Sequence, residues 1–81
     1  MDPNVTLDRI VRMITIHVPP EERVLEMARI NRELKDARIP TQLRPVFQHG
    51  QPTITYQRLY PHDVYLVPLL NILQELWDLV Y

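Results

Sequence analysis

The side chains best suited to chemistry near neutral pH are two histidines with neighbouring carboxylates. His17 is followed by Glu21 and Glu22, and His62 is followed directly by Asp63. Imidazole and carboxylate groups bind divalent metal ions and exchange protons near pH 7. His17, Glu21, His62 and Asp63 therefore form a candidate polar site for a metal ion or small molecule, provided that the fold brings the two segments together. The alternative is that they are ordinary loop residues and that Asp63 only caps a helix.

A second group of side chains suits contact with nucleic acid. Arg44, Tyr56 and Arg58 lie in a stretch that also contains other aromatic residues, and such a surface can combine phosphate contacts with base stacking. The net charge of −1 argues against this interpretation. An exposed sheet face with cross-strand aromatic pairs is the simpler explanation.

The composition argues against an enzyme. The chain contains no cysteine and no serine, and its single glycine cannot form a glycine-rich phosphate loop. The usual nucleophiles are thus missing, and no cofactor-binding motif is present. We predict a protein that is not an enzyme and that has no cofactor.

The length of 81 residues predicts a single domain spanning residues 1–81. The N-terminal residues show no signal-peptide pattern. The apolar C-terminal segment is interrupted by Asn71, Gln74, Glu75 and Asp78, so it is not a membrane span. We therefore expect no membrane association and a cytoplasmic protein.

Three elements are indicated by local pattern. A helix is predicted from Pro20 to about Arg38, because two glutamates follow the proline and apolar residues recur at helical spacing. Two β-rich runs around Gly50 predict a hairpin. A last helix begins either at Asp63 or at Pro68.

The N-terminal segment is ambiguous, and it decides the topology. Six of the nine residues from Ile10 to Val18 are β-branched, which favours a strand over residues 11–18. Leu7, Ile10 and Ile14 also fit a helix that starts after Asp2. We predict an α+β domain of order β-α-β-β-α, with a three-stranded sheet and two helices on one face; the alternative is α-α-β-β-α. In the predicted topology the four residues of the polar site share one sheet edge.

The strongest functional signal is the C-terminal helix, which is apolar around most of its circumference. One small sheet cannot cover so wide an apolar surface, and large exposed apolar surfaces mark interfaces. The predicted interface residues are Leu66, Leu69, Leu70, Leu73, Leu76, Trp77, Val80 and Tyr81. We therefore predict an interaction module that forms a homodimer or higher oligomer, or docks on another protein. Nucleic acid is a less favoured partner, and a metal or small-molecule site at His17 and His62 is the weakest alternative.

Overall fold

The structure is a computed structural model that describes residues 2–48 and 51–80. The bounds of its elements are α1 Pro3–His17, α2 Pro20–Asp36, β1 Leu43–Gln48, β2 Gln51–Tyr56, the short 3-10 helix η1 Asp63–Tyr65, and α3 Leu66–Val80. The described residues form one antiparallel sheet of two strands. The predicted β-α-β-β-α order with three strands is therefore wrong, and the alternative α-α-β-β-α order is the one observed.

Helix α1 replaces the strand predicted at residues 11–18. The Asp2 side chain caps it by accepting a hydrogen bond from the N–H of Asn4, at 2.9 Å. Three side chains on one side of α1 are completely buried: Leu7, Ile10 and Ile14. Each such burial is worth about 1.5–3 kcal/mol, whereas a β-branched residue loses at most about 0.7 kcal/mol of helix propensity. Tertiary packing thus outweighs the local preference for a strand.

Helix α2 begins at Pro20, as predicted, and ends two residues before the predicted Arg38. Arg38 adopts a left-handed conformation with φ of 58°. The N–H of Ile39 then donates to the carbonyl of Leu34 at 2.9 Å, and the N–H of Arg38 donates to that of Lys35 at 3.0 Å. This is the Schellman arrangement that ends a helix by pairing its last carbonyls.

The hairpin is confirmed, with Leu43 opposite Tyr56 and Gln48 opposite Gln51. The turn predicted at His49 and Gly50 lies outside the described residues. Because directly opposed residues share a face of the sheet, Leu43 and Tyr56 face the helices, and both are at least partly buried.

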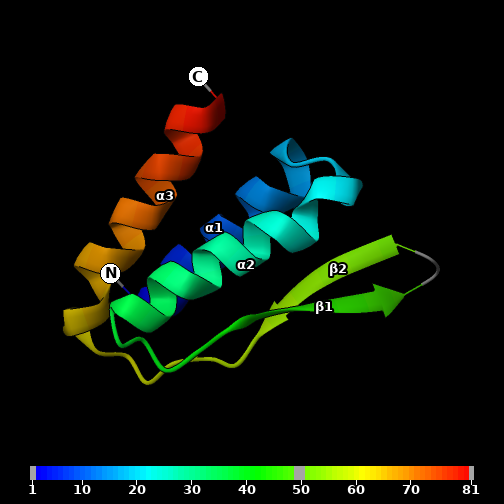
Figure 1. The fold of residues 1–81 in the computed structure, drawn as a ribbon. Helices are drawn as coiled ribbons and strands as arrows, with labels where there is room; N and C mark the ends of the chain where they lie inside the picture. The colour runs from blue at the N-terminus through cyan, green and yellow to red at the C-terminus, as the bar shows by residue number, and fades with distance from the viewer. Residues whose placement is uncertain (1, 49–50, 81) are drawn as a thin grey trace.

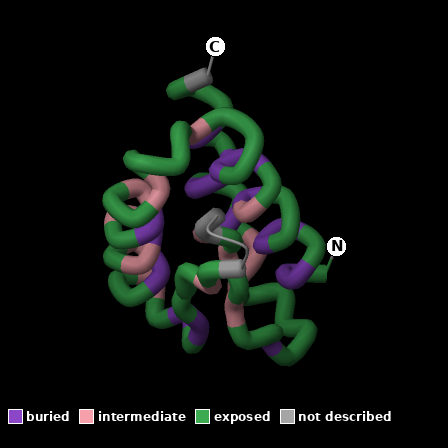
Figure 2. The backbone as a smooth tube through the Cα atoms, turned by 90° about the vertical axis from the view of Figure 1, so that its right-hand side faces the viewer, coloured by how far each residue is buried: buried purple, intermediate pink, exposed green. Residues whose placement is uncertain are grey.

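The fold has three layers (Figure 1). Helices α1 and α2 form the middle layer, α3 packs mainly on α1 and less on α2, and the hairpin lies on the other side, with β1 against α2 and β2 against α1. The buried residues lie along the inner faces of the helices, as the colouring of the backbone in Figure 2 shows. In the predicted topology, α2 and α3 cover one face of the sheet. In the structure, α1 and α2 cover that face instead.

Two asparagines attach the hairpin to the helices. The side-chain amide of Asn31, on α2, donates to the carbonyl of Leu43 at 2.9 Å and accepts from its N–H at 2.7 Å. Asn4, on α1, makes the same pair of bonds with the backbone of Leu59, both at 2.8 Å. We call each of these pairs of hydrogen bonds an asparagine clamp. Each clamp satisfies one backbone donor and one backbone acceptor at an end of the hairpin segment. Together the two clamps position the surfaces described below.

Candidate protein interface

The predicted interface residues of α3 fall on two different parts of that helix. Leu69, Leu73 and Leu76 are buried in the core, and Leu66 is half-buried. Leu70 and Trp77 remain 42% and 39% exposed. The side chain of Val80 and the whole of Tyr81 lie outside the described part of the chain. Of the predicted interface residues, Leu70 and Trp77 therefore remain available to a partner, and Val67 and Leu79 of α3 are also exposed.

The buried arc of α3 is wide because two helices cover it. The premise that only a small sheet is available to shelter this helix is wrong, since α1 and α2 both contact α3. The fold thus encloses more of the helix than the predicted topology allows.

A groove lies between α1 and α3, on the side of Trp77. It has a volume of about 360 Å³ and is lined by Arg9, Arg12, Met13, Ile16, His17, Leu73 and Trp77. We call it the α1–α3 groove. Its apolar floor continues outward into Ile16, which is 60% exposed.

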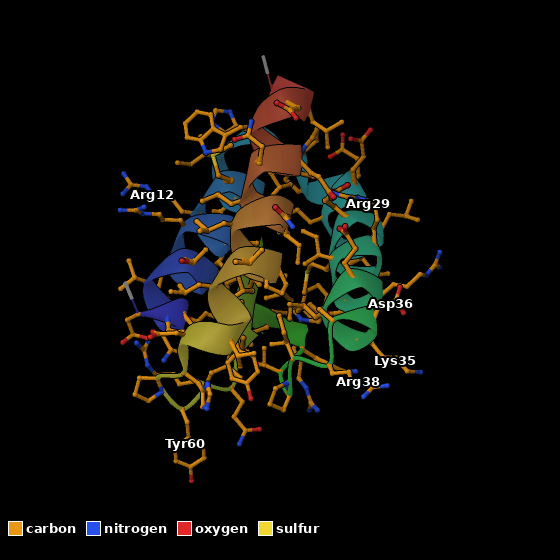
Figure 3. The ribbon with its side chains drawn as sticks, turned by 90° about the vertical axis from the view of Figure 1, so that its left-hand side faces the viewer. Arg12, Arg29, Lys35, Asp36, Arg38 and Tyr60 are labelled. Carbon is orange, nitrogen blue, oxygen red and sulfur yellow. The ribbon has the colours of Figure 1, made fainter. Side chains whose placement is uncertain are left out.

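Two arginines line the α1 rim of the α1–α3 groove, and Asp78 lies next to Trp77 on α3 without lining the groove itself. Arg9 and Arg12 lie on the α1 rim, and Figure 3 shows Arg12 extending away from the body of the protein. Asp78 follows Trp77 on α3, is exposed, and accepts a hydrogen bond from Gln74 at 3.0 Å. Within residues 2–48 and 51–80, none of these three charged side chains forms an ion pair.

Helices α1 and α3 run in the same direction along this groove. A second hollow, of about 270 Å³, lies at the carboxyl ends of both helices and shares Met13 and His17 with the groove. It is lined on the α3 side by Leu76 and Leu79. The end of α1 therefore lies beside the end of α3, so residues at corresponding positions along the two helices stand at similar heights.

The opposite flank of α3 is occupied by an internal ion network. Arg29 on α2 bonds to Glu33 at 3.0 Å, to Glu75 on α3 at 3.3 Å, and also to Glu26 (Figure 3). Partial burial and the neighbouring Glu75 carboxylate raise the pKa of Glu33. Because its charged groups already bind one another, this flank is less suited to a partner than the α1–α3 groove.

The predicted polar site is not assembled. His17 ends α1 and Glu21 begins α2, so these two are close in the chain, whereas His62 and Asp63 follow Leu59, which is bound at the start of α1. Fifteen residues of helix separate the two ends by about 22 Å. The shared sheet edge that was to join them does not exist. His62 instead packs against Tyr65, with ring centroids 5.8 Å apart.

No group of three histidine, aspartate or glutamate side chains that could hold a metal ion occurs in the described ranges. Asp63 does not cap a helix with its side chain either: it is the first residue of η1, and His62 occupies the cap position.

The three candidate nucleic-acid residues point to different places. The hydroxyl of Tyr56 donates to the carboxylate of Asp8 and lies 3.1 Å from the carbonyl oxygen of Asn4. Burial and the adjacent Asp8 raise the pKa of Tyr56 to about 12. Arg58 lies 4.0 Å from the same carboxylate. Tyr56 and Arg58 thus attach the hairpin to α1. Arg44 is the one candidate of the three that faces solvent without such a partner among the described residues.

The candidate interface residues missed by sequence reasoning are Arg9, Arg12 and Ile16. Their spacing of three, then four, places them on one side of a helix, but this signal appears only if residues 3–17 are treated as helical.

Comparisons with protein-family models, with curated proteins and with solved structures found no match to this chain. Among its described helices, none has both the length and the apolar character needed to cross a membrane.

Proposed function

We propose that this protein is a non-catalytic interaction module that forms a homodimer through the α1–α3 groove. The observation that carries the proposal is the groove itself, which has an apolar floor and a basic rim on α1, with the exposed Asp78 next to Trp77 on α3. A homodimer with twofold symmetry needs a surface that is complementary to itself, and a surface with basic side chains on one helix and an acidic side chain on the other meets that condition.

The geometry of such a dimer follows from the direction of the helices. A twofold axis running along the groove places α1 of one copy on α3 of the other, with both helices still pointing the same way. Ile16 of one copy then stands opposite Trp77 of the second, and the long Arg12 side chain, which starts about 6 Å lower on α1, extends along the groove towards Asp78. The apolar side chains become buried between two charge pairs, one at each edge of the interface.

Aromatic anchors support the choice of this surface. Tryptophan is enriched among the residues that dominate binding energy at interfaces, and Trp77 borders the groove while remaining 39% exposed. The charged side chains at the edges of the interface would determine the orientation of the second copy more than the affinity of the dimer.

Charge reversal tests this proposal. Arg12→Asp and Asp78→Arg each convert two attractive pairs per dimer into repulsive ones. Because an exposed ion pair contributes about 0.2–1 kcal/mol, each reversal should weaken the dimer by roughly tenfold, or about 1.4 kcal/mol. The double variant restores both pairs and should recover the dimer. The measurement is molar mass by size-exclusion chromatography with light scattering, over a range of protein concentrations.

An apolar variant with a matched control completes the test. Ile16→Glu should abolish the dimer, whereas Leu25→Glu should not, because Leu25 is 75% exposed on α2 and borders neither the groove nor the neighbouring hollow. A wild-type protein that stays monomeric up to millimolar concentration contradicts the proposal. So does a dimer that responds equally to both glutamate variants.

A further inference from the structure

A polar hollow lies at the root of the hairpin, on the side of the fold away from α3. It has a volume of about 580 Å³ and is bordered by the end of α2, the connection of residues 39–42, and the first residues of the hairpin. We call it the hairpin-root basin. Pockets for small molecules typically measure about 300–1,000 Å³, so the basin is large enough to hold one.

The charged side chains lining the hairpin-root basin are Lys35 and Arg44, and no carboxylate lines it. In the described part of the chain neither cation forms an ion pair. The nearby Asp36 borders a different hollow, between α2 and α3. Figure 3 shows Lys35 extending into solvent from the end of α2. The basin therefore carries two positive charges that nothing within it balances.

Several backbone acceptors near the basin are already used. The carbonyl of Leu43 accepts from Asn31, and that of Gln57 accepts from the hydroxyl of Thr41 at 2.7 Å. The capping motif at the end of α2 pairs the last carbonyls of that helix. In contrast, the side chains of Gln42 and Thr55, which also line the basin, form no hydrogen bond with any residue that the structure describes. Gln42 and Thr55 can each donate and accept, whereas Lys35 and Arg44 can only donate, so the side chains of the basin offer more donors than acceptors.

The asparagine clamp holds the two cations on neighbouring elements. Asn31 binds the backbone of Leu43, Lys35 lies one helical turn after Asn31, and Arg44 is the next residue after Leu43. The cationic side chains thus start from two segments that are bonded directly to each other. Such an arrangement lowers the entropy that a ligand must overcome to bring them together.

We infer that the hairpin-root basin binds the phosphate group of a small molecule. A phosphate carries about −1.5 to −2 charges near pH 7, which matches one lysine and one arginine, whereas a carboxylate balances only one of them. Arginine binds phosphate through two parallel hydrogen bonds and lysine binds it as a point charge. The inference is independent of the proposed dimer, since the groove and the basin share no residue.

Titration of the ¹⁵N-labelled protein with inorganic phosphate tests this inference, with the ionic strength held constant by sodium chloride. Amide shifts should saturate and should centre on residues 41–44 and 55–57. Lys35→Gln and Arg44→Gln should each raise the dissociation constant at least fivefold. Arg32→Gln is the matched control, because it removes the same charge from an exposed position on α2 that does not line the basin, and it should change the constant less than twofold.

Several results would overturn the inference. Shifts that never saturate, that spread equally to Arg9 and Arg12, or that respond equally to Arg32→Gln would show only a general attraction of anions to arginines. A parallel titration uses phenyl phosphate and a short oligothymidylate. Phenyl phosphate should compete with inorganic phosphate; tighter binding of the oligonucleotide, lost equally in Arg44→Gln and Arg58→Gln, would indicate a nucleic-acid surface instead.

Discussion

Replacing Asn4 with alanine should destabilise the fold by about 2–6 kcal/mol. The Asn4 amide donates to the carbonyl of Leu59 and accepts from its N–H, both at 2.8 Å and both in buried positions. Alanine leaves that donor and that acceptor unpaired, at about 1–3 kcal/mol for each group. An 81-residue domain is stable by only about 4–12 kcal/mol in total. The variant should therefore lose about half of the original stability.

Urea unfolding followed by far-ultraviolet circular dichroism measures this loss. The unfolding midpoint should fall strongly, and hydrogen exchange at the amide of Leu59 should accelerate, because that N–H loses its partner. Asn71→Ala is the matched control: Asn71 is exposed on α3, so its removal should change the free energy of unfolding by less than about 0.5 kcal/mol. If Asn4→Ala costs no more than this control, the clamp does not hold the hairpin and the reasoning is refuted.

Two further predictions concern a hydroxyl and a backbone angle. The phenolate of Tyr56 should form only near pH 12, against 10.0 for an ordinary tyrosine. The raised pKa means that the fold favours the neutral phenol. The stabilising contribution of this phenol is therefore complete below about pH 10 and is lost as the pH rises towards 12. The difference in alkaline absorbance titration between wild type and Tyr56→Phe measures this, and a wild-type component at pH 10 assigned to Tyr56 would contradict it. Arg38→Gly should raise the free energy of unfolding by about 0.5–1 kcal/mol. A left-handed residue with a Cβ costs about 1–2 kcal/mol, and glycine removes this cost. Part of the gain is offset, because glycine loses more backbone entropy on folding than arginine does. Thermal unfolding checks it, and an equal gain in Arg38→Ala, which keeps the Cβ, would exclude the left-handed angle as the cause.

The part of the fold that could be predicted is the part with local signals. The proline and the glutamates at the start of α2 indicate a helix start, and the buried Met27, Ile30 and Leu34 follow at helical spacing. The hairpin was likewise predictable, because β-rich runs on both sides of a glycine favour one. In each case a contiguous segment contains the information that determines its own conformation.

The N-terminal segment could not be assigned from local preference, because its residues satisfy two patterns at once. Its β-branched residues favour a strand, while Leu7, Ile10 and Ile14 have helical spacing. The choice depends on whether α2 and α3 are available to cover that stripe, which is a property of the whole fold. The wrong assignment of this segment also misplaced the candidate polar site, because a sheet edge was expected at His17, where the structure has the end of a helix.

Candidate site residues were predictable only in kind. That α3 is apolar around most of its circumference can be read from its residues, but whether Leu73 is core or Leu70 is surface depends on which neighbours α3 meets. Arg9 and Arg12 carry no signal of their own until α1 is known to be a helix lying beside α3.

The amino-acid sequence by itself determined that residues from Pro20 form a helix and that a hairpin follows, since these features depend on neighbours in the chain. Only the tertiary structure decided that residues 3–17 are helical, that Asn4 and Asn31 hold the hairpin, and that a groove brings the arginines of α1 beside Trp77 of α3. The physical reason is that burial and hydrogen bonding between segments distant in the chain contribute several kilocalories per mole, more than the fraction of a kilocalorie per residue by which local preferences differ.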